Sequence, residues 1–195
     1  MSSFTYLALG DSYTIGEKVA ENERWPVQLA LKLGWQVPQI IATTGWTSQE
    51  LLDALDQAKL KKHYDWVSLL IGVNDQYDGV PLHTYQENLT LLSERMLDIV
   101  SDRRHIFMLS IPDYSITPFV KEKGMDPVKV GKALELFNQA NAEAAHHYGF
   151  QFCNVTPFSR TAEKDFSLLA EDQLHPSGKM YSAWVAQLLK DCDFS

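Results

Sequence analysis

Cysteine is scarce in this chain, which has only Cys153 and Cys192 among its 195 residues. Two cysteines are too few for the disulfide framework of a small secreted domain, and they do not stand in the close spacing typical of metal sites. No stretch combines a basic start, an apolar run and a small-residue cleavage site, although a signal already removed would leave no trace. We therefore expect a cytoplasmic protein that binds no metal.

Long hydrophobic runs and an excess of positive charge are also absent. The longest apolar runs fall far short of the roughly 20 residues needed to cross a bilayer, so we expect no membrane insertion. The 17 basic residues are outnumbered by 25 acidic ones, which gives a formal net charge of −8. Nucleic acids and anionic membranes need a basic face, so neither is an expected partner.

The remaining composition is that of an ordinary globular protein, with 45% hydrophobic and 22% charged residues. A chain of this length suits one domain with one core, and we predict a single domain over residues 1–195. Nothing in the sequence predicts the oligomeric state.

Short apolar runs that end at glycine, proline or polar residues recur along the chain, as is typical of buried strands. They predict five strands, at 4–9, 37–42, 66–71, 106–109 and 150–155. Apolar residues at three- and four-residue spacings predict helices over 82–99, 130–148 and 181–189, with Pro176 opening the last one. This alternation predicts one α/β domain with a parallel sheet, which binds ligands at the carboxyl ends of its strands.

Residues that could take part in catalysis follow three of these strands. Ser12 stands directly after the first strand, where a following helix would point backbone N–H groups at an anion. Gly45 follows the second strand and lets the backbone approach a ligand closely. Asn74 follows the third strand and carries an amide that can donate to an oxyanion. Each has an ordinary alternative as a helix cap or a turn residue.

A fourth block lies before the last predicted helix, where Asp172 precedes His175 by three residues. A carboxylate placed in this way can orient an imidazole and stabilise its protonated form when it takes a proton from a serine. The alternative is a solvated loop charge beside a capping histidine.

Together these blocks resemble the GDSL-type lipase and esterase family, also called SGNH hydrolases. The resemblance extends over nearly the whole chain and rests on Gly10-Asp11-Ser12, Gly45, Gly72-Val73-Asn74-Asp75 and Asp172-Gln173-Leu174-His175. Two positions depart from the family pattern: Tyr13 stands where the family name implies leucine, and Thr43 stands where asparagine is frequent.

The resemblance implies a flavodoxin-like three-layer α/β/α sandwich with a five-stranded parallel sheet. It also implies hydrolysis of carboxylic esters, with thioesters as a further option, through an acyl-enzyme intermediate and without a cofactor. Ser12 would be the nucleophile, His175 the general base and then acid, and Asp172 the residue that orients it. The oxyanion would be held by the backbone N–H groups of Ser12 and Gly45 and by the side chain of Asn74.

The resemblance implies a small-molecule ester as substrate, and the motifs do not define its acyl and alcohol parts. Four aromatic residues on loops at the expected catalytic edge are candidate substrate contacts, or else they pack over the rim of the sheet: Trp46, Tyr77, Tyr114 and Phe119. We expect the loop over 111–127, which contains Phe119, to restrict the enzyme to short or medium acyl groups.

Two other functions remain open from sequence alone. Flavodoxin-like sheets bind flavins or phosphates in hydroxyl-rich loops after the first strand, and the residues around Ser12 fit such a loop. That alternative leaves Asn74 and His175 without a role. A catalytically inactive interaction protein is the second alternative, and the complete set of reactive groups argues against it.

Overall fold

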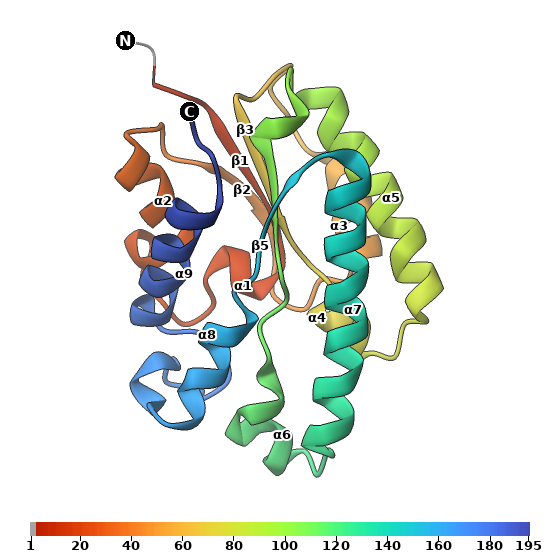
Figure 1. The fold of residues 1–195 in the computed structure, drawn as a ribbon, viewed down its shortest axis with the longest axis vertical. Helices are drawn as coiled ribbons and strands as arrows, with labels where there is room; N and C mark the ends of the chain where they lie inside the picture. The colour runs from red at the N-terminus through yellow and green to blue at the C-terminus, as the bar shows by residue number, and fades with distance from the viewer. Residues whose placement is uncertain (1–2) are drawn as a thin grey trace.

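Five short strands form one parallel sheet in the computed structural model, which describes residues 3–195 (Figure 1). The sheet has the order β2-β1-β3-β4-β5, which is the flavodoxin-like order. The strands are β1 (Tyr6–Gly10), β2 (Gln39–Ala42), β3 (Trp66–Leu70), β4 (Ile106–Leu109) and β5 (Gln151–Cys153).

The two central strands, β1 and β3, are buried at every position because helices cover both of their faces. Burial on both faces explains why their sequences are mostly apolar rather than alternating. The polar Ser68 of β3 is buried with its hydroxyl hydrogen-bonded to that of Tyr6. In the register, Gly10 lies opposite both Ala42 of β2 and Leu70 of β3. These three strands therefore end at the same level, and the turns that follow them lie side by side.

Helices form a layer on each face of the sheet (Figure 1). One layer contains α2 (Trp25–Leu33) and α9 (Gly178–Asp191), and the other contains α3 (Ser48–Gln57), α5 (Leu82–Ile99) and α7 (Pro127–Tyr148). The predicted three-layer α/β fold is confirmed. Shorter helices are α1 (Ser12–Ile15), α4 (Val73–Tyr77), α6 (Pro118–Glu122) and α8 (Thr156–Arg160).

Short 3₁₀ helices occur in the connections between these elements: η1 (Glu21–Glu23), η2 (Arg103–His105), η3 (Tyr114–Ile116), η4 (Thr161–Glu163) and η5 (Phe166–Leu168). The predicted loop over 111–127 is therefore wrong in part, because η3 and α6 lie within it. Asp113 caps η3 through its side chain, and Pro118 occupies the first turn of α6, where proline is favoured.

The prediction that Pro176 opens the last helix is also wrong. The helix begins at Gly178, and the Ser177 side chain accepts a hydrogen bond from the N–H of Met180. Pro176 instead lies in a bridge with Leu169. A serine cap satisfies a free N–H group of the first turn, which proline does not do.

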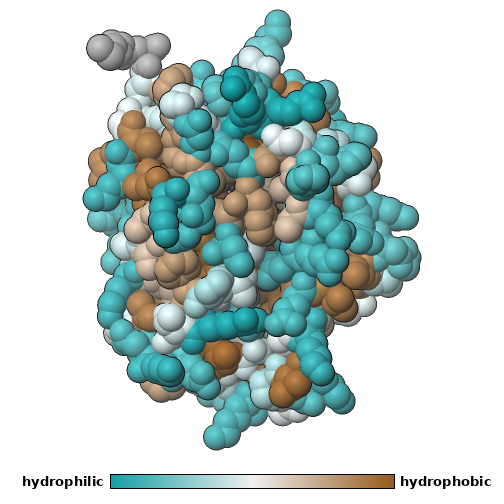
Figure 2. All heavy atoms as spheres, in the orientation of Figure 1, coloured by the Kyte–Doolittle hydropathy of each residue, from teal (hydrophilic) through white to brown (hydrophobic). Residues whose placement is uncertain are grey.

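Within residues 3–195 no helix combines the length and the apolar character needed to cross a membrane. Hydrophilic residues cover much of the face seen in Figure 2, with apolar residues in separate patches between them.

The turn after β3 is closely packed at Gly72. Gly72 has φ +117°, and a Cβ atom there would lie 2.4 Å from the Tyr85 hydroxyl oxygen. Tyr85 is fully buried, and its hydroxyl donates to the carbonyl of Ile71 at 2.9 Å. The ring of Tyr85 therefore occupies the space of the missing side chain and fixes the start of α4.

We predict that Gly72→Ala lowers the free energy of unfolding by about 2–4 kcal/mol, because backbone strain and a steric clash both act. Gly79→Ala is the matched control, since Gly79 has φ +74° but no atom within 4 Å of the added Cβ. The control should lose only about 1 kcal/mol, from strain alone. Urea unfolding of both variants measures the difference, and equal losses would contradict the proposed packing of Tyr85.

Candidate active site

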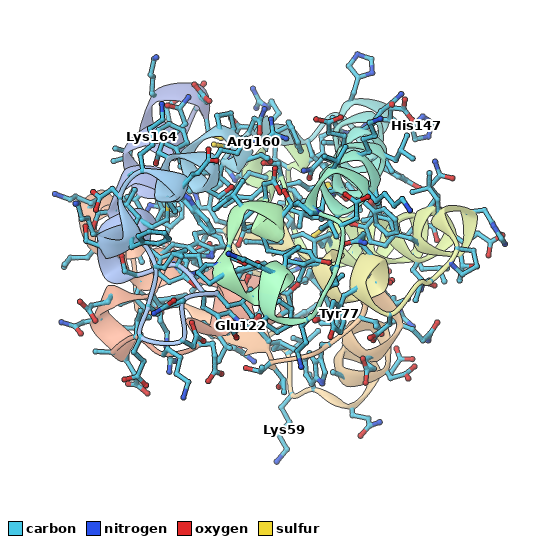
Figure 3. All side chains as sticks on the ribbon, turned by 90° about the horizontal axis from the view of Figure 1, so that it is seen from below. Lys59, Tyr77, Glu122, His147, Arg160 and Lys164 are labelled. Atoms are coloured by element: carbon cyan, nitrogen blue, oxygen red, sulfur yellow. The ribbon has the colours of Figure 1, made fainter. Side chains whose placement is uncertain are left out.

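A pocket of about 280 Å³ opens at the carboxyl edge of the sheet. Figure 3 is viewed from this side, with α6 in front of the edge and Tyr77 beside it. Turns after β1, β2 and β3, the segment after β4, and the segment before α9 all contribute to its lining. The lining residues are Ser12, Tyr13, Thr44, Gly45, Val73, Asn74, Tyr77, Tyr114, Phe119, Lys123, Leu174 and His175.

Ser12 is the first residue of α1, directly after the turn that ends β1. Asp11 caps this short helix, and its side chain accepts a hydrogen bond from the N–H of Tyr13 at 2.9 Å. Within residues 3–195 neither the hydroxyl nor the backbone N–H of Ser12 makes a hydrogen bond. Both groups are therefore available to a ligand in the pocket.

Gly45 and Asn74 present two further donors to the same pocket. Gly45 has φ +88°, a conformation that suits glycine, and its N–H makes no hydrogen bond within the described chain. The Asn74 side-chain nitrogen donates one hydrogen bond, to the carbonyl of Trp46 at 2.8 Å. Since an amide nitrogen carries two hydrogens, one remains for a ligand.

The turns that carry Gly45 and Asn74 are joined by a buried pair, Ser48 and Asp75. The Asp75 carboxylate accepts from the Ser48 N–H at 2.8 Å and from the Ser48 hydroxyl at 2.5 Å. Asn88 of α5 donates to the same hydroxyl at 2.9 Å. Ser48 was not predicted from the sequence, although Thr47 and Glu50 form a capping box that marks the start of α3.

Asp172 and His175 meet as the sequence predicts. The Asp172 carboxylate lies 2.7 Å from Nδ1 of His175, and its other oxygen accepts from the N–H groups of Leu174 and His175, each at 3.0 Å. Gln173 between them has φ +56°, the left-handed backbone that closes this turn. Burial disfavours the charge of Asp172, but these hydrogen bonds outweigh it and hold the pKa of Asp172 below its usual value.

Tyr13 packs against the imidazole of His175 at 5.8 Å between ring centroids, in an edge-to-face arrangement. It also contacts Trp184 of α9 at 6.4 Å. The departure from the family leucine thus places an aromatic ring beside His175. Because Asp172 lies against Nδ1, and Nε2 makes no hydrogen bond among residues 3–195, Nε2 is the ring nitrogen available to a ligand.

Three of the four predicted substrate residues line the pocket as one aromatic cluster. Tyr77 lies 5.9 Å from Phe119 and 6.5 Å from Tyr114, and Tyr114 lies 6.4 Å from Phe119. The Tyr114 hydroxyl donates to Gln76 at 2.7 Å, and burial raises its pKa to about 12, so the ring is neutral at pH 7. The cluster is therefore an uncharged wall.

Trp46 does not line the pocket. Its side chain is half-buried against the hydrophobic core, and only its carbonyl contributes to the site, through Asn74. Lys123, which sequence reasoning missed, lies at the end of α6 and does line the pocket. A lone surface lysine carries no motif, so no sequence signal distinguishes it.

The part of the chain that the structure describes contains no group of three His, Cys, Asp or Glu residues able to hold a metal ion. The expectation of a metal-free, cofactor-free site stays a prediction.

Residues 8–183 match the GDSL-like lipase/acylhydrolase family. The match spans most of the chain and includes every motif that carries the resemblance. The chain belongs to this family and is a carboxylic ester hydrolase. No curated protein matches it in sequence.

Solved structures with the same fold include several esterases. The extracellular lipase from Streptomyces rimosus has a TM-score of 0.77 at 18% identity, over 97% of this chain and 100% of that one. Axe2, an acetylxylan esterase from Geobacillus stearothermophilus, has a TM-score of 0.72 at 18% identity, over 100% and 96%. EstA from Pseudoalteromonas sp., a psychrotrophic esterase, has a TM-score of 0.69 at 19% identity, over 97% and 96%.

Asp11 is a buried carboxylate beside Ser12 that has little to stabilise its charge. Burial and the neighbouring Asp75 raise its pKa to about 8, although its hydrogen bond from Tyr13 acts in the opposite direction. One of its two oxygens has no hydrogen-bond partner among the described residues. Its raised pKa favours the protonated form of Asp11 in the folded protein.

We predict that the stability of the wild type falls relative to Asp11→Asn as the pH rises. An unfolded aspartate titrates near pH 4, so between about pH 4 and pH 8 the folded protein binds one more proton than the unfolded chain. The difference in free energy of unfolding between the wild type and Asp11→Asn should change by at most about 1.4 kcal/mol per pH unit. Urea unfolding of both proteins across this window tests it, with the exposed Asp78→Asn as control. A constant difference would mean that Asp11 is ionised throughout.

Proposed function

We propose that the enzyme hydrolyses esters through an acyl-enzyme intermediate on Ser12, with His175 as base and Asp172 as the residue that orients it. The observation that carries this proposal is the 2.7 Å contact between Asp172 and His175 in a pocket shared with Ser12. The unused N–H groups of Ser12 and Gly45 at the same pocket support it further.

In the first half of the reaction, the hydroxyl oxygen of Ser12 forms a bond to the ester carbonyl carbon. Its proton passes to Nε2 of His175, which Asp172 holds in the correct tautomer through Nδ1. The tetrahedral intermediate then collapses, the bond to the alcohol oxygen breaks, and His175 gives the proton to the leaving alcohol. The hydroxyl makes no hydrogen bond in the ligand-free site, and catalytic hydrogen bonds often form only with substrate bound.

In the second half, a water molecule replaces the alcohol. His175 takes one of its protons while the water oxygen attacks the acyl carbon, and the bond to Ser12 breaks as His175 returns the proton to the serine oxygen. Acid and Ser12 are released. The same residue thus acts as base and then acid in both halves.

The negative charge of each tetrahedral intermediate is held by three donors: the backbone N–H groups of Ser12 and Gly45 and the second amide hydrogen of Asn74. Donors that are fixed before the reaction need no reorganisation when the charge develops, and this is where such sites gain most of their rate. The hydrogen bond from Asn74 to Trp46 supports this role by orienting the amide.

We propose that the wall formed by Tyr77, Tyr114 and Phe119 limits the acyl group to short or medium length. A pocket of about 280 Å³ is small for a long acyl chain. The flavin- or phosphate-binding alternative loses support, because it gives no role to the paired Asp172 and His175. A cytoplasmic location stays a prediction from the two cysteines, both of which are free.

We predict that a fluorophosphonate adds one covalent adduct to the protein, on Ser12. The structure of EstA, which shares this fold, is described as inhibited by monoethylphosphonate. Intact mass and peptide mapping locate the adduct, and Ser12→Ala should lower turnover of a chromogenic ester by roughly 10⁴-fold or more. Ser101→Ala, a change at an exposed serine outside the pocket, is the control. Labelling at another residue would refute the assignment of Ser12.

We predict that Phe119→Ala shifts the preferred acyl length towards longer chains and leaves acetyl turnover nearly intact. Each methylene buried against the wall contributes about 0.8 kcal/mol, so preference rises with length until the wall is reached. Initial rates across a series of 4-nitrophenyl esters measure the profile. Phe166→Ala, at an exposed phenylalanine outside the pocket, is the matched control. An equal loss on every ester would indicate that Phe119 supports the fold only.

A further inference from the structure

Lys123 is the one lining residue of the pocket that carries a permanent positive charge. It follows α6 directly, and its Nζ lies 5.5 Å from the centre of the Phe119 ring. Lys123 is exposed as a residue, and the contact of its ammonium group with the Phe119 ring places that charge at the edge of the apolar wall.

The ammonium group of Lys123 has no acidic partner. Across residues 3–195 no carboxylate oxygen lies within 4 Å of its Nζ, whereas Lys18 and Lys179 each pair with a carboxylate. Among the described residues, the pocket lining also contains no aspartate or glutamate. Most lysines among residues 3–195 also lack a carboxylate partner, and Lys123 differs from them because it lines the pocket.

The aromatic wall leads from the catalytic residues to this cation. Tyr114 and Tyr77 contact each other and both contact Phe119, and Phe119 in turn contacts Lys123. A substrate whose reacting carbon lies at Ser12 and whose body packs on these rings would therefore point its far end at the ammonium group. A negative charge at the far end of the substrate would form an ion pair with Lys123. A negative charge on the part of the substrate that packs on the rings would lose its hydration without gaining a partner.

We propose that the natural substrate of this pocket is an ester with a carboxylate at the end remote from the ester bond, and that Lys123 binds that carboxylate. The inference rests on the proposed function, because it places the ester carbon at Ser12. The carboxylate belongs either to the acyl group, as in a monoester of a dicarboxylic acid, or to the alcohol. The chemistry of recognition is the same in both.

The test compares two pairs of substrates that are matched in size. In the acyl pair, the 4-nitrophenyl monoester of adipic acid is compared with 4-nitrophenyl hexanoate. In the alcohol pair, 4-carboxyphenyl butyrate is compared with 4-methylphenyl butyrate. For each pair the measured quantity is the ratio of kcat/KM for the anionic ester to that for the neutral one. The pair whose ratio responds to Lys123 identifies the part that carries the charge.

Two variants remove or reverse the charge, and a third is the control. Lys123→Met should lower the ratio by about two- to fivefold, mainly through KM, since a partly exposed ion pair is worth up to about 1 kcal/mol. Lys123→Glu should lower it further. Lys121→Met removes an exposed lysine of α6 that lines a neighbouring groove rather than this pocket, so it should leave the ratio unchanged. Added salt should lower the ratio in the wild type and not in Lys123→Met.

The outcomes separate this inference from the proposed function. If none of the four esters is hydrolysed through Ser12, the proposed function fails and the inference fails with it. If the esters are hydrolysed and the ratios of both pairs are the same in the wild type and in Lys123→Met, the inference alone is overturned. An equal fall in Lys121→Met would also overturn it, because the effect would then reflect the general charge of α6.

Discussion

The hydrogen bonds between the Asp75 carboxylate and Ser48 hold the candidate site together. Asp75 lies on α4, one residue after Asn74, and Ser48 begins α3, three residues after Gly45. Two of the proposed oxyanion donors belong to loops that are far apart in the chain, and this pair fixes one loop to the other. A second link between the same loops is the hydrogen bond from the Asn74 side chain to the carbonyl of Trp46.

This arrangement requires a carboxylate to be buried, which is unfavourable unless its oxygens are hydrogen-bonded. Burial raises the pKa of Asp75, and the two hydrogen bonds from Ser48 oppose that rise. Asn88 of α5 adds a third polar group to the cluster. The cluster is specific because any shift of α3 against α4 would break hydrogen bonds in a region that water does not reach.

The sequence predicts the parts of this structure that depend on burial and on local backbone. Strands such as β1 and β3 are recognisable because both faces are covered, so their residues are mostly apolar. Asp172 and His175 are recognisable because they stand three positions apart in the sequence and one turn brings them together. The hydrogen bonds between Ser48 and Asp75 could not be predicted in the same way. They join positions 27 residues apart in the chain, which only the complete fold brings together.

The features that were predicted wrongly or not at all depend on short local elements or on the position of one element in the fold. Pro176 has a residue type suited to the first turn of a helix, but Ser177 supplies a side-chain cap and so determines where α9 begins. The segment over 111–127 lacks helical periodicity because η3 and α6 are each only a few residues long. Lys123 is a single charged residue whose position in the pocket depends on where α6 lies.

The site divides into a rigid part and a part that is free to vary. Ser12, Gly45 and Asn74 stand on turns after three adjacent strands, and the register of those strands sets the positions of the turns. Phe119 and Lys123 stand on or directly after α6, whose largest contact with the molecule is through η3. A substitution on α6 can change the shape or charge of the wall without moving the three donors. Substrate range in this enzyme can therefore change through α6, while the residues proposed to carry out the reaction remain fixed by the sheet.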